Sequence, residues 1–376
     1  MVNYVQSQDS RGFGTVGKYI QGPKELAHLT EYLSDYGTSP LFLIDPFFYD
    51  EMAQWLQAEC RVKELNASFV KFGTVSSMKE IDRLTDFGRG QTCDVLAAIG
   101  GGSALDTGKA VAVNLGVPMV MVPTAASCDA PCSRITAVYN EDGSVCPLFH
   151  KKNPDLVLVD TEVILRAPVR MLSAGIGDAL ATWLEARAAY ACGAVNGIGK
   201  GYRISRAGMA VARTAYEILM TEGVEAYLSA KAGIRTQAFE DVVEANILLS
   251  GVGFENTACS IAHGFQASAS GAVPEMHRCM HGEKVSYGIL VQLLLENRPR
   301  EEIYEIADFL IGVGLPVTLA ELGVTENAAE KMRALAHYGI EHKALMHVEP
   351  FAVTEDSLYQ AILFADEVGK GRKAFQ

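Results

Sequence analysis

The sequence predicts an N-terminal α/β domain around a doubly wound parallel sheet, followed by an all-helical C-terminal domain. The chain has 376 residues, which is enough for two cores because single domains cluster at about 100–200 residues. Its first part alternates short apolar runs with helical patterns, and its second part contains helical patterns alone. The change falls near residues 161–168, so we expect domains at 1–165 and 166–376.

The strands of the first domain are predicted from short apolar runs. Most of them are continuously apolar rather than alternating, as expected of parallel strands that helices cover on both faces. The runs and the helical patterns between them follow the rhythm of a doubly wound sheet. The apolar runs occupy residues 41–45, 67–72, 94–100, 117–123 and 156–161, and two of the helical patterns occupy 24–36 and 77–90.

One insertion departs from that rhythm. RITAVY, NEDGS and VCPLF predict a β-hairpin that turns at Asp142-Gly143, a strong turn signal. The second domain is predicted from long amphipathic patterns with helical periodicity. These patterns occupy residues 170–190, 204–223, 237–253, 283–297 and 301–314. A cleft between two domains is the default place for a ligand.

The charge and composition of the chain limit the classes of molecule that it is expected to bind. The formal net charge is -13, which argues against nucleic acid or an anionic membrane because phosphate binding requires a basic surface. The N-terminus lacks a signal-peptide apolar core, and no run approaches the ~18–20 apolar residues of a membrane span. We therefore expect a cytoplasmic protein. None of the 8 cysteines forms a CxxC pair, so no thiolate zinc site is indicated and reduced thiols are expected.

A glycine run between a predicted strand and a predicted helix indicates a phosphate site. Gly100, Gly101 and Gly102 let a ligand approach the backbone without a Cβ clash, and Ser103 is expected to cap the helix. The free N–H groups of a helix N-terminus favour an anion, here a pyrophosphate. The segment matches neither GxGxxG nor a P-loop, so a tight turn stays an alternative. Asp45, at the end of the run 41–45, is placed to accept a ribose hydroxyl and to disfavour NADP, with a turn or N-cap aspartate as the alternative.

Three residues have the character of a zinc site. Asp178 lies in a glycine-rich helix start, His263 on an apolar helical stretch and His281 before another helix. An aspartate and two imidazoles make a plausible zinc shell with one position open. The two histidines would lie about 27 Å apart on one continuous helix, so the chain must turn back between them, as Gly271 and Pro274 allow. The alternatives are hydrogen-bonded core histidines, an N-cap role for Asp178, and a competing ligand in His277.

The chain resembles, nearly end to end, the glycerol dehydrogenases of the iron-containing alcohol dehydrogenase superfamily. Seven segments carry the resemblance in the right order: GKYIQG, GGGSALDTGKA, PTAASCDAPCS, NPDLVLVDT, AGIGDALATWLEARA, EANILLSGVGFE and HGEKVSYGILVQL. The family has the same two-domain arrangement. The resemblance implies a homo-oligomer, an octamer or smaller, that uses NAD and one zinc ion per subunit to oxidise a small polyol, with glycerol as the first expectation.

The resemblance also implies site residues. Asp178, His263 and His281 match the zinc ligands and are expected to be catalytic together with Asp129, an acid beside the substrate. Phe254 matches an aromatic wall of the substrate pocket. The residues expected to bind NAD are Asp45, Gly100, Gly101, Gly102, Ser103, Asp106, Thr124, Ser127, Ser133, Ile135 and Tyr139.

Four positions depart from the family pattern. Thr182 stands where iron enzymes carry a fourth ligand, which favours zinc with three ligands. Gln266 replaces a histidine, and Arg134 and Arg278 are unexpected charges near the substrate side. If both arginines clamped a carboxylate, the substrate would be a 2-hydroxy or 2-oxo acid; the alternative is that both arginines are solvated. A phosphorylated substrate, with Lys151-Lys152 as the basic pair, and a nucleotide-binding protein without activity are further alternatives.

Overall fold

The computed structural model describes residues 9–140 and 144–375. The N-terminal part is built on a 6-stranded sheet with the order β1-β8-β5-β4-β2-β3, and every neighbouring pair in it is parallel. This confirms the predicted parallel α/β fold. The strands are β1 (Lys18–Gly22), β2 (Pro40–Ile44), β3 (Ser68–Lys71), β4 (Val95–Gly100), β5 (Met119–Pro123) and β8 (Leu156–Asp160).

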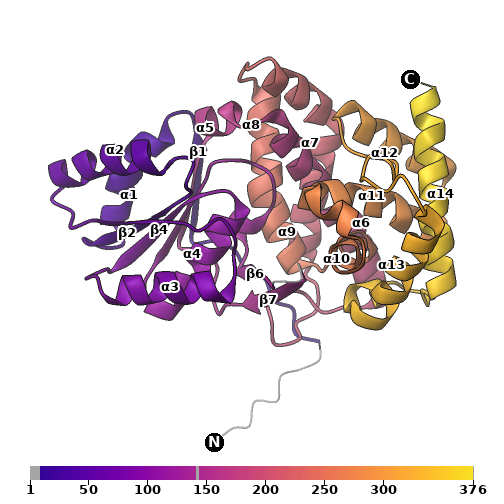
Figure 1. The fold of residues 1–376 in the computed structure, drawn as a ribbon, viewed down its shortest axis with the longest axis horizontal. Coiled ribbons are helices and arrows are strands. Elements are labelled where there is room, and N and C mark those ends of the chain that lie inside the picture. The colour runs from indigo at the N-terminus through magenta and orange to yellow at the C-terminus, as the bar shows by residue number, and fades with distance from the viewer. Residues whose placement is uncertain (1–8, 141–143, 376) are drawn as a thin grey trace, which may run out of the picture.

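Helices cover both faces of this sheet (Figure 1). Along β2, Phe42 and Ile44 join one core cluster with the first helices of the chain, whereas Leu41 and Leu43 join the other. Because both faces are covered, alternate residues of a strand are equally apolar, which explains the continuous runs in the sequence. The first face carries η1 (Glu25–His28), α1 (Leu29–Ser34) and α2 (Tyr49–Val62), and the second carries α3 (Met78–Arg89) and α4 (Gly102–Leu115).

A hairpin lies where the sheet meets the helical part (Figure 1). It is preceded by the 3-10 turn η2 (Ala130–Cys132), and β6 (Ile135–Tyr139) pairs antiparallel with β7 (Val145–Phe149). The predicted hairpin strands are confirmed. The predicted turn at Asp142-Gly143 falls outside the described residues.

The rest of the chain that the structure describes is helical. The core cluster on the α3 and α4 face of the sheet continues into these helices, through residues such as Val159, Ile164 and Ile176. The helices are α5 (Thr161–Arg166), α6 (Val169–Cys192), α7 (Arg206–Lys231), α8 (Gln237–Glu244), η3 (Ala245–Leu249), α9 (Ser250–Asn256), α10 (Ile261–Ala272), η4 (Pro274–Arg278), α11 (His281–Leu295), α12 (Arg300–Gly312), α13 (Ala328–His342), η5 (Ala344–His347) and α14 (Glu355–Ala374).

Two features differ from the sequence prediction. The first strand of the chain is β1 rather than the run 41–45, and β1 pairs with β8 far along the sequence. The pattern 237–253 predicts one regular helix, but a π-helical turn at η3 separates α8 from α9. One extra residue per turn rotates the faces that follow, and such turns are often found at functional sites.

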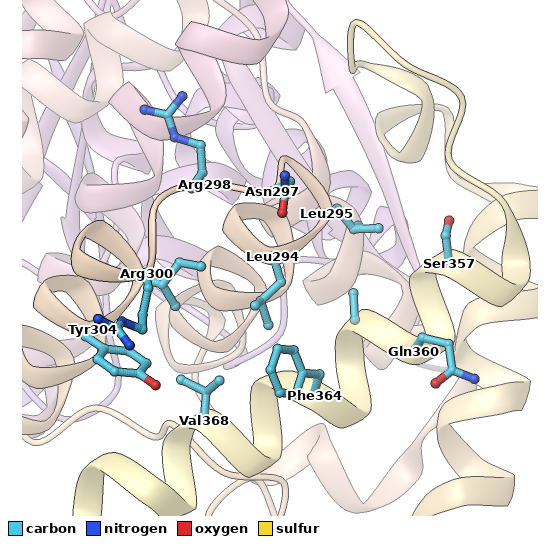
Figure 2. A pocket seen from close by; sticks show the side chains of 12 residues that line it. Leu294, Leu295, Asn297, Arg298, Arg300, Tyr304, Ser357, Gln360, Phe364 and Val368 are labelled. Atoms are coloured by element: carbon cyan, nitrogen blue, oxygen red, sulfur yellow. The ribbon is translucent and has the colours of Figure 1, made fainter.

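An open groove of about 910 Å³ lies on the helical part, floored by Leu294 and Leu295 and bordered by Phe364 (Figure 2). These two leucines end α11, so about 20 Å of helix separates them from His281 at its start. The groove therefore lies apart from the residues expected to carry chemistry. Among the described residues, no helix combines the length and the apolar character needed to cross a bilayer.

Candidate metal centre and dinucleotide loop

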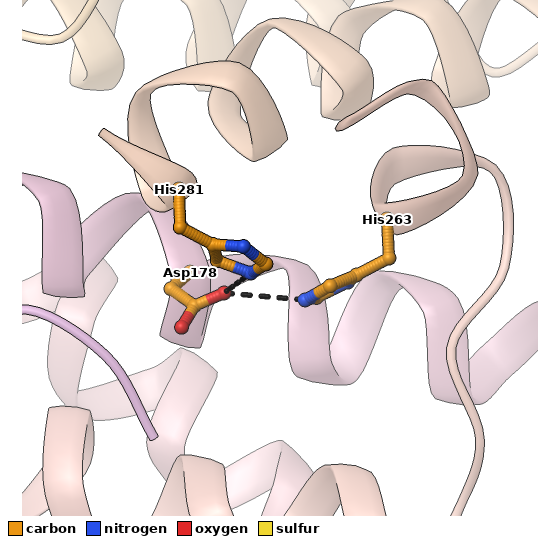
Figure 3. Close-up of side chains that lie close together, drawn as sticks. All are labelled: Asp178, His263 and His281. Carbon is orange, nitrogen blue, oxygen red and sulfur yellow. Dashed lines mark hydrogen bonds and ion pairs between the residues drawn. The ribbon is translucent and has the colours of Figure 1, made fainter. Parts of the chain in front are cut away.

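Asp178, His263 and His281 come from three helices and meet at one point (Figure 3). Asp178 lies in the middle of α6, His263 in the first turn of α10, and His281 at the start of α11. The Oδ1 atom of Asp178 is 3.2 Å from Nε2 of His263 and 3.1 Å from Nε2 of His281. Asp178 is nine residues inside its helix, which excludes the N-cap alternative.

These distances fit a zinc ion. Two ligand atoms that are each about 2.0–2.1 Å from one tetrahedral ion lie roughly 3.3 Å apart. The three ligand atoms all lie within 4.8 Å of one another. The side chain of Asp178 is 1 % exposed, and although burial alone would raise its pKa, the imidazoles of His281 and His263 hold that pKa below its usual range. A buried carboxylate between two imidazole nitrogens is a suitable donor set for one divalent cation.

Glycines bring two of the three helices, α6 and α11, close enough for this centre. A Cβ atom on Gly282 would stand 1.8 Å from the carbonyl oxygen of Ala174, and one on Gly177 would stand 2.7 Å from the carbonyl oxygen of Gly282. The start of α11 therefore lies directly against the backbone of α6. Because His281 precedes Gly282, this contact fixes the distance between His281 and Asp178.

We expect Gly282→Ala to weaken metal binding as well as the fold. The new methyl group would force α11 away from α6, and overpacking of this kind costs about 1–3 kcal/mol. Half of that strain on the bound state corresponds to a loss of zinc affinity of about 2–10-fold in a zinc titration, and thermal melting should show a lower Tm. Gly371→Ala, on α14 with no atom within 4 Å of the new Cβ, is the matched control. Unchanged zinc affinity in Gly282→Ala would contradict the role given to this contact.

The glycine loop lies between β4 and α4. A Cβ on Gly100 would approach Asp45 Cβ to 2.9 Å, and one on Gly102 would approach the sulfur of Cys128 to 2.8 Å, whereas Gly101 faces open space. The N-cap of α4 is Gly101, so the expectation that Ser103 caps the helix is wrong. With glycine at the cap, no side chain caps the start of α4, and although the N–H of Ala104 donates to the carbonyl of Gly101, the N–H groups before it can bind an anion.

Asp45 follows β2 at the carboxyl edge of the sheet, beside the loop. Its Oδ1 atom accepts a hydrogen bond of 3.0 Å from the backbone N–H of Phe47. This is the turn role that the sequence left open as an alternative. The same side chain lies against Gly100, so its second oxygen stays beside the loop, where a ribose acceptor is expected.

Residues 128 and 129 connect the glycine loop with the metal centre. Cys128 packs on Gly102, and the backbone N–H of Asp129 donates to Oδ2 of Asp178 over 3.4 Å. Burial, followed by the charge of Asp178, raises the pKa of Asp129 well above its usual range. The predicted cofactor loop and the predicted metal ligands are thus parts of one site.

A buried lysine that the sequence reading overlooked supports this segment. Lys109 is fully buried on α4, and its Nζ pairs with Oδ1 of Asp106 at 2.8 Å. The same ammonium donates to the carbonyl oxygens of Ala130 (2.8 Å), Ser133 (3.3 Å) and Ile135. Asp106 uses its other oxygen to accept from the N–H of Ala137, 3.0 Å away. Asp106 and Lys109 therefore hold the hairpin on α4.

The other residues expected at the cofactor and substrate surround this segment. Thr124, buried after β5, donates its N–H to the carbonyl of Gly100. Ser127 is half-buried just before Cys128. Burial and the charge of Asp106 raise the pKa of Tyr139, at the end of β6, to about 12. Phe254 lies on α9, whose Gly251 packs against the backbone of Asp129.

The departures from the family pattern have local partners. The hydroxyl of Thr182 lies 3.0 Å from that of Ser250, and Gln266 donates to Ser270 on the same helix. His277 bonds to the carbonyl of Ser270 through Nε2, so that ring nitrogen is engaged away from the three ligands. Among the described residues, the group around Asp178 contains only His263 and His281 as further ligands.

The two arginines do not form a visible carboxylate clamp. The guanidinium of Arg134 donates to the carbonyls of Gly197 and His150 and pairs with Glu255 at 3.2 Å. Arg278 lies exposed against Gly323. Arg134 is thus a structural residue that joins the hairpin to the helical part.

A glycine loop suited to a dinucleotide lies beside a candidate metal centre, where the α/β part meets the helical part. This combination is typical of the metal-dependent alcohol dehydrogenases. The chain belongs to the iron-containing alcohol dehydrogenase family, whose sequence model matches residues 17–161. It is 41 % identical to a glycerol dehydrogenase of Escherichia coli O6:H1 over 94 % of this chain and 96 % of the relative. It is 40 % identical to a glycerol dehydrogenase of Pseudomonas putida over 96 % and 98 %. The crystal structure of a probable glycerol dehydrogenase from Sinorhizobium meliloti 1021 superposes with a TM-score of 0.91 at 38 % identity, covering 96 % of this chain and 99 % of that one.

Proposed function

We propose that the protein oxidises a small polyol, glycerol to dihydroxyacetone, with NAD as the hydride acceptor and one zinc ion per subunit. The observation that carries the proposal is the meeting of Asp178, His263 and His281 within 4.8 Å, joined to the glycine loop through Cys128 and Asp129. Relatives named glycerol dehydrogenase match nearly the whole chain, which supports glycerol as the substrate.

In this proposal, each part of the site has one task. The free N–H groups at the start of α4 bind the pyrophosphate, and Asp45 accepts a hydrogen bond from the adenosine ribose. The nicotinamide side of the cofactor is lined by Thr124, Ser127, Ser133, Ile135 and Tyr139. Two further residues are expected to contribute to cofactor binding. Ser103 lies in the first turn of α4, and Asp106 holds the hairpin in place.

Asp178, His263 and His281 would hold the zinc ion, which supplies Lewis-acid activation of a hydroxyl group when it is bound. Asp129 lies beside Asp178 and would orient a substrate hydroxyl or relay its proton. Phe254 would wall the substrate pocket from α9. The protein contributes orientation and charge, and the nicotinamide supplies the hydride chemistry.

The alternatives are weaker on structural grounds. A carboxylate substrate would need Arg134, whose donors already bind Gly197, His150 and Glu255. A phosphorylated substrate would need the basic pair at 151–152, but Lys152 is paired with Asp155 at 2.7 Å. We further propose a domain division at residue 165 from the change in sequence pattern, a cytoplasmic location from the sequence, and a homo-oligomer of eight subunits or fewer from the family resemblance.

A substrate panel tests the function. We expect kcat/KM for glycerol or 1,2-propanediol with NAD to exceed that for 2-hydroxybutyrate by at least about tenfold, because a carboxylate clamp would need Arg134, whose donors already bind Gly197 and His150. NADP should be a poorer acceptor than NAD because Asp45 repels a 2′-phosphate. Chelator should abolish turnover, and added zinc should restore it. Faster turnover of 2-hydroxybutyrate, or full activity without metal, would overturn the proposal.

A further inference from the structure

Glu185 is a buried carboxylate on α6 that contacts His263 from behind. Its Oε2 atom lies 2.6 Å from Nδ1 of His263, the ring nitrogen opposite the one near Asp178. Its Oε1 atom accepts two backbone hydrogen bonds of 2.8 Å, from the N–H groups of Ser260 and His263. Glu185 is itself 0 % exposed.

This arrangement selects one form of the imidazole. Both oxygens of an ionised carboxylate are acceptors, so the hydrogen in the short contact must sit on Nδ1 of His263. In a neutral imidazole the lone pair is then on Nε2, which points towards Asp178 and His281. A metal ion needs that lone pair, and a carboxylate behind a ligating histidine also makes the ring a stronger donor.

We propose that Glu185 is a positioning residue of the metal centre, which fixes the tautomer and the ring orientation of His263 and thereby sets the zinc affinity. The inference deepens the proposed zinc-dependent function and rests on it. Glu185 does not bind zinc in this proposal. It acts through its contact with Nδ1, while its two backbone contacts keep the carboxylate from turning.

Glu185→Gln is a sharp test because an amide cannot satisfy all three donors. If the amide oxygen replaces Oε1, the amide N–H group faces Nδ1 and requires a lone pair there, which moves the ring proton to Nε2. If the oxygen replaces Oε2, the amide N–H group opposes the N–H groups of Ser260 and His263. Either orientation conflicts with zinc binding or with the local backbone, although the side-chain shape is unchanged.

The experiment measures the zinc dissociation constant of folded protein by competition with a chromophoric chelator, together with the Tm of the metal-free and zinc-loaded forms. We expect Glu185→Gln to raise the dissociation constant by about 10–100-fold, as is usual when a partner behind a metal ligand is lost. The Tm increase on zinc addition should shrink accordingly. A purely structural role would instead lower the Tm of the metal-free form and leave the dissociation constant of the folded protein unchanged.

Glu349→Gln is the matched control. Glu349 is also a buried glutamate in this region, and its Oε1 atom accepts from the hydroxyl of Ser260 at 2.8 Å without contacting His263. A glutamine retains that acceptor, so zinc affinity should stay at the wild-type value. Glu185→Asp keeps the charge but shortens the side chain, and we expect it to weaken zinc binding less than Glu185→Gln does.

The outcomes separate this inference from the function on which it rests. Wild-type zinc affinity in Glu185→Gln overturns the inference, and if that variant does not fold, wild-type affinity in Glu185→Asp overturns it. A second zinc ion per subunit also overturns it, because Cys259, Glu185 and His263 would then be ligands of that ion. If the wild-type protein binds no zinc, the proposed function has failed instead.

Discussion

Asp178→Asn is expected to give a folded protein that has lost both its zinc ion and its activity. In the wild-type protein, the Oδ1 atom of Asp178 lies at hydrogen-bond distance from the imidazoles of His263 and His281. The amide of an asparagine has no charge with which to hold a cation between them. Loss of one partner of a buried charge pair costs about 3–5 kcal/mol, so zinc affinity should fall on the order of 10²–10³-fold. Metal analysis after dialysis and turnover of glycerol would both measure the effect.

Asp366→Asn serves as its control, because Asp366 is a buried aspartate that binds Leu319 N–H at 2.8 Å and Lys370, away from the centre. That variant should retain zinc and turnover. The Tm of metal-free Asp178→Asn should fall below that of the metal-free wild type, because the carboxylate that pairs with both imidazoles is lost, so zinc content is compared on protein that is folded. Retention of stoichiometric zinc by Asp178→Asn would show that the ion binds elsewhere.

Lys109→Met is expected to give the largest loss of stability. The ammonium is fully buried, and its removal leaves the carboxylate of Asp106 and three carbonyl groups without their donor. Removal of one partner of such a pair costs about 3–5 kcal/mol, which corresponds to a fall in Tm of about 5 °C for a chain of this length. The hairpin that carries Ile135 and Tyr139 should loosen as well, so NAD affinity should fall in the same variant.

The double variant Asp106→Asn, Lys109→Met tests the cause. With the carboxylate removed, no buried charge is left without a partner, and much of the lost stability should return. Thermal melting of the two single variants and the double variant gives the coupling. Additive losses would mean that the charge pair is not what holds the hairpin on α4. Lys18→Met, at a lysine side chain that is 58 % exposed, should change Tm little.

Much of the fold could be predicted because its signals are local. The runs at 41–45 and 94–100 became β2 and β4 to within one residue at each end, since strands covered on both faces are apolar throughout. The strand β1 was not predicted because KYIQG is short and only partly buried. Its place in the sheet depends on pairing with β8, a contact that no local pattern encodes.

In the candidate site, too, residues with a local sequence signal could be predicted, and residues that depend on long-range contacts could not. Asp178, His263 and His281 were predicted as a group, and the structure brings them together. Glu185 and Lys109 were not, because a single charged residue on an apolar helix gives no periodic signal that separates a buried contact from a solvated one. Arg134 was read as a substrate-side charge, and only the long-range contacts with Gly197 and Glu255 show otherwise.

The three side chains expected to bind the metal ion differ in their exposure to solvent. His281 is 35 % exposed, whereas His263 is 10 % and Asp178 is 1 % exposed. We therefore expect a metal ion or a chelator to reach the centre from the side of His281. Substrate bound on that side would cover the ion, so we expect a chelator to remove zinc faster from the protein alone than from the protein with glycerol present.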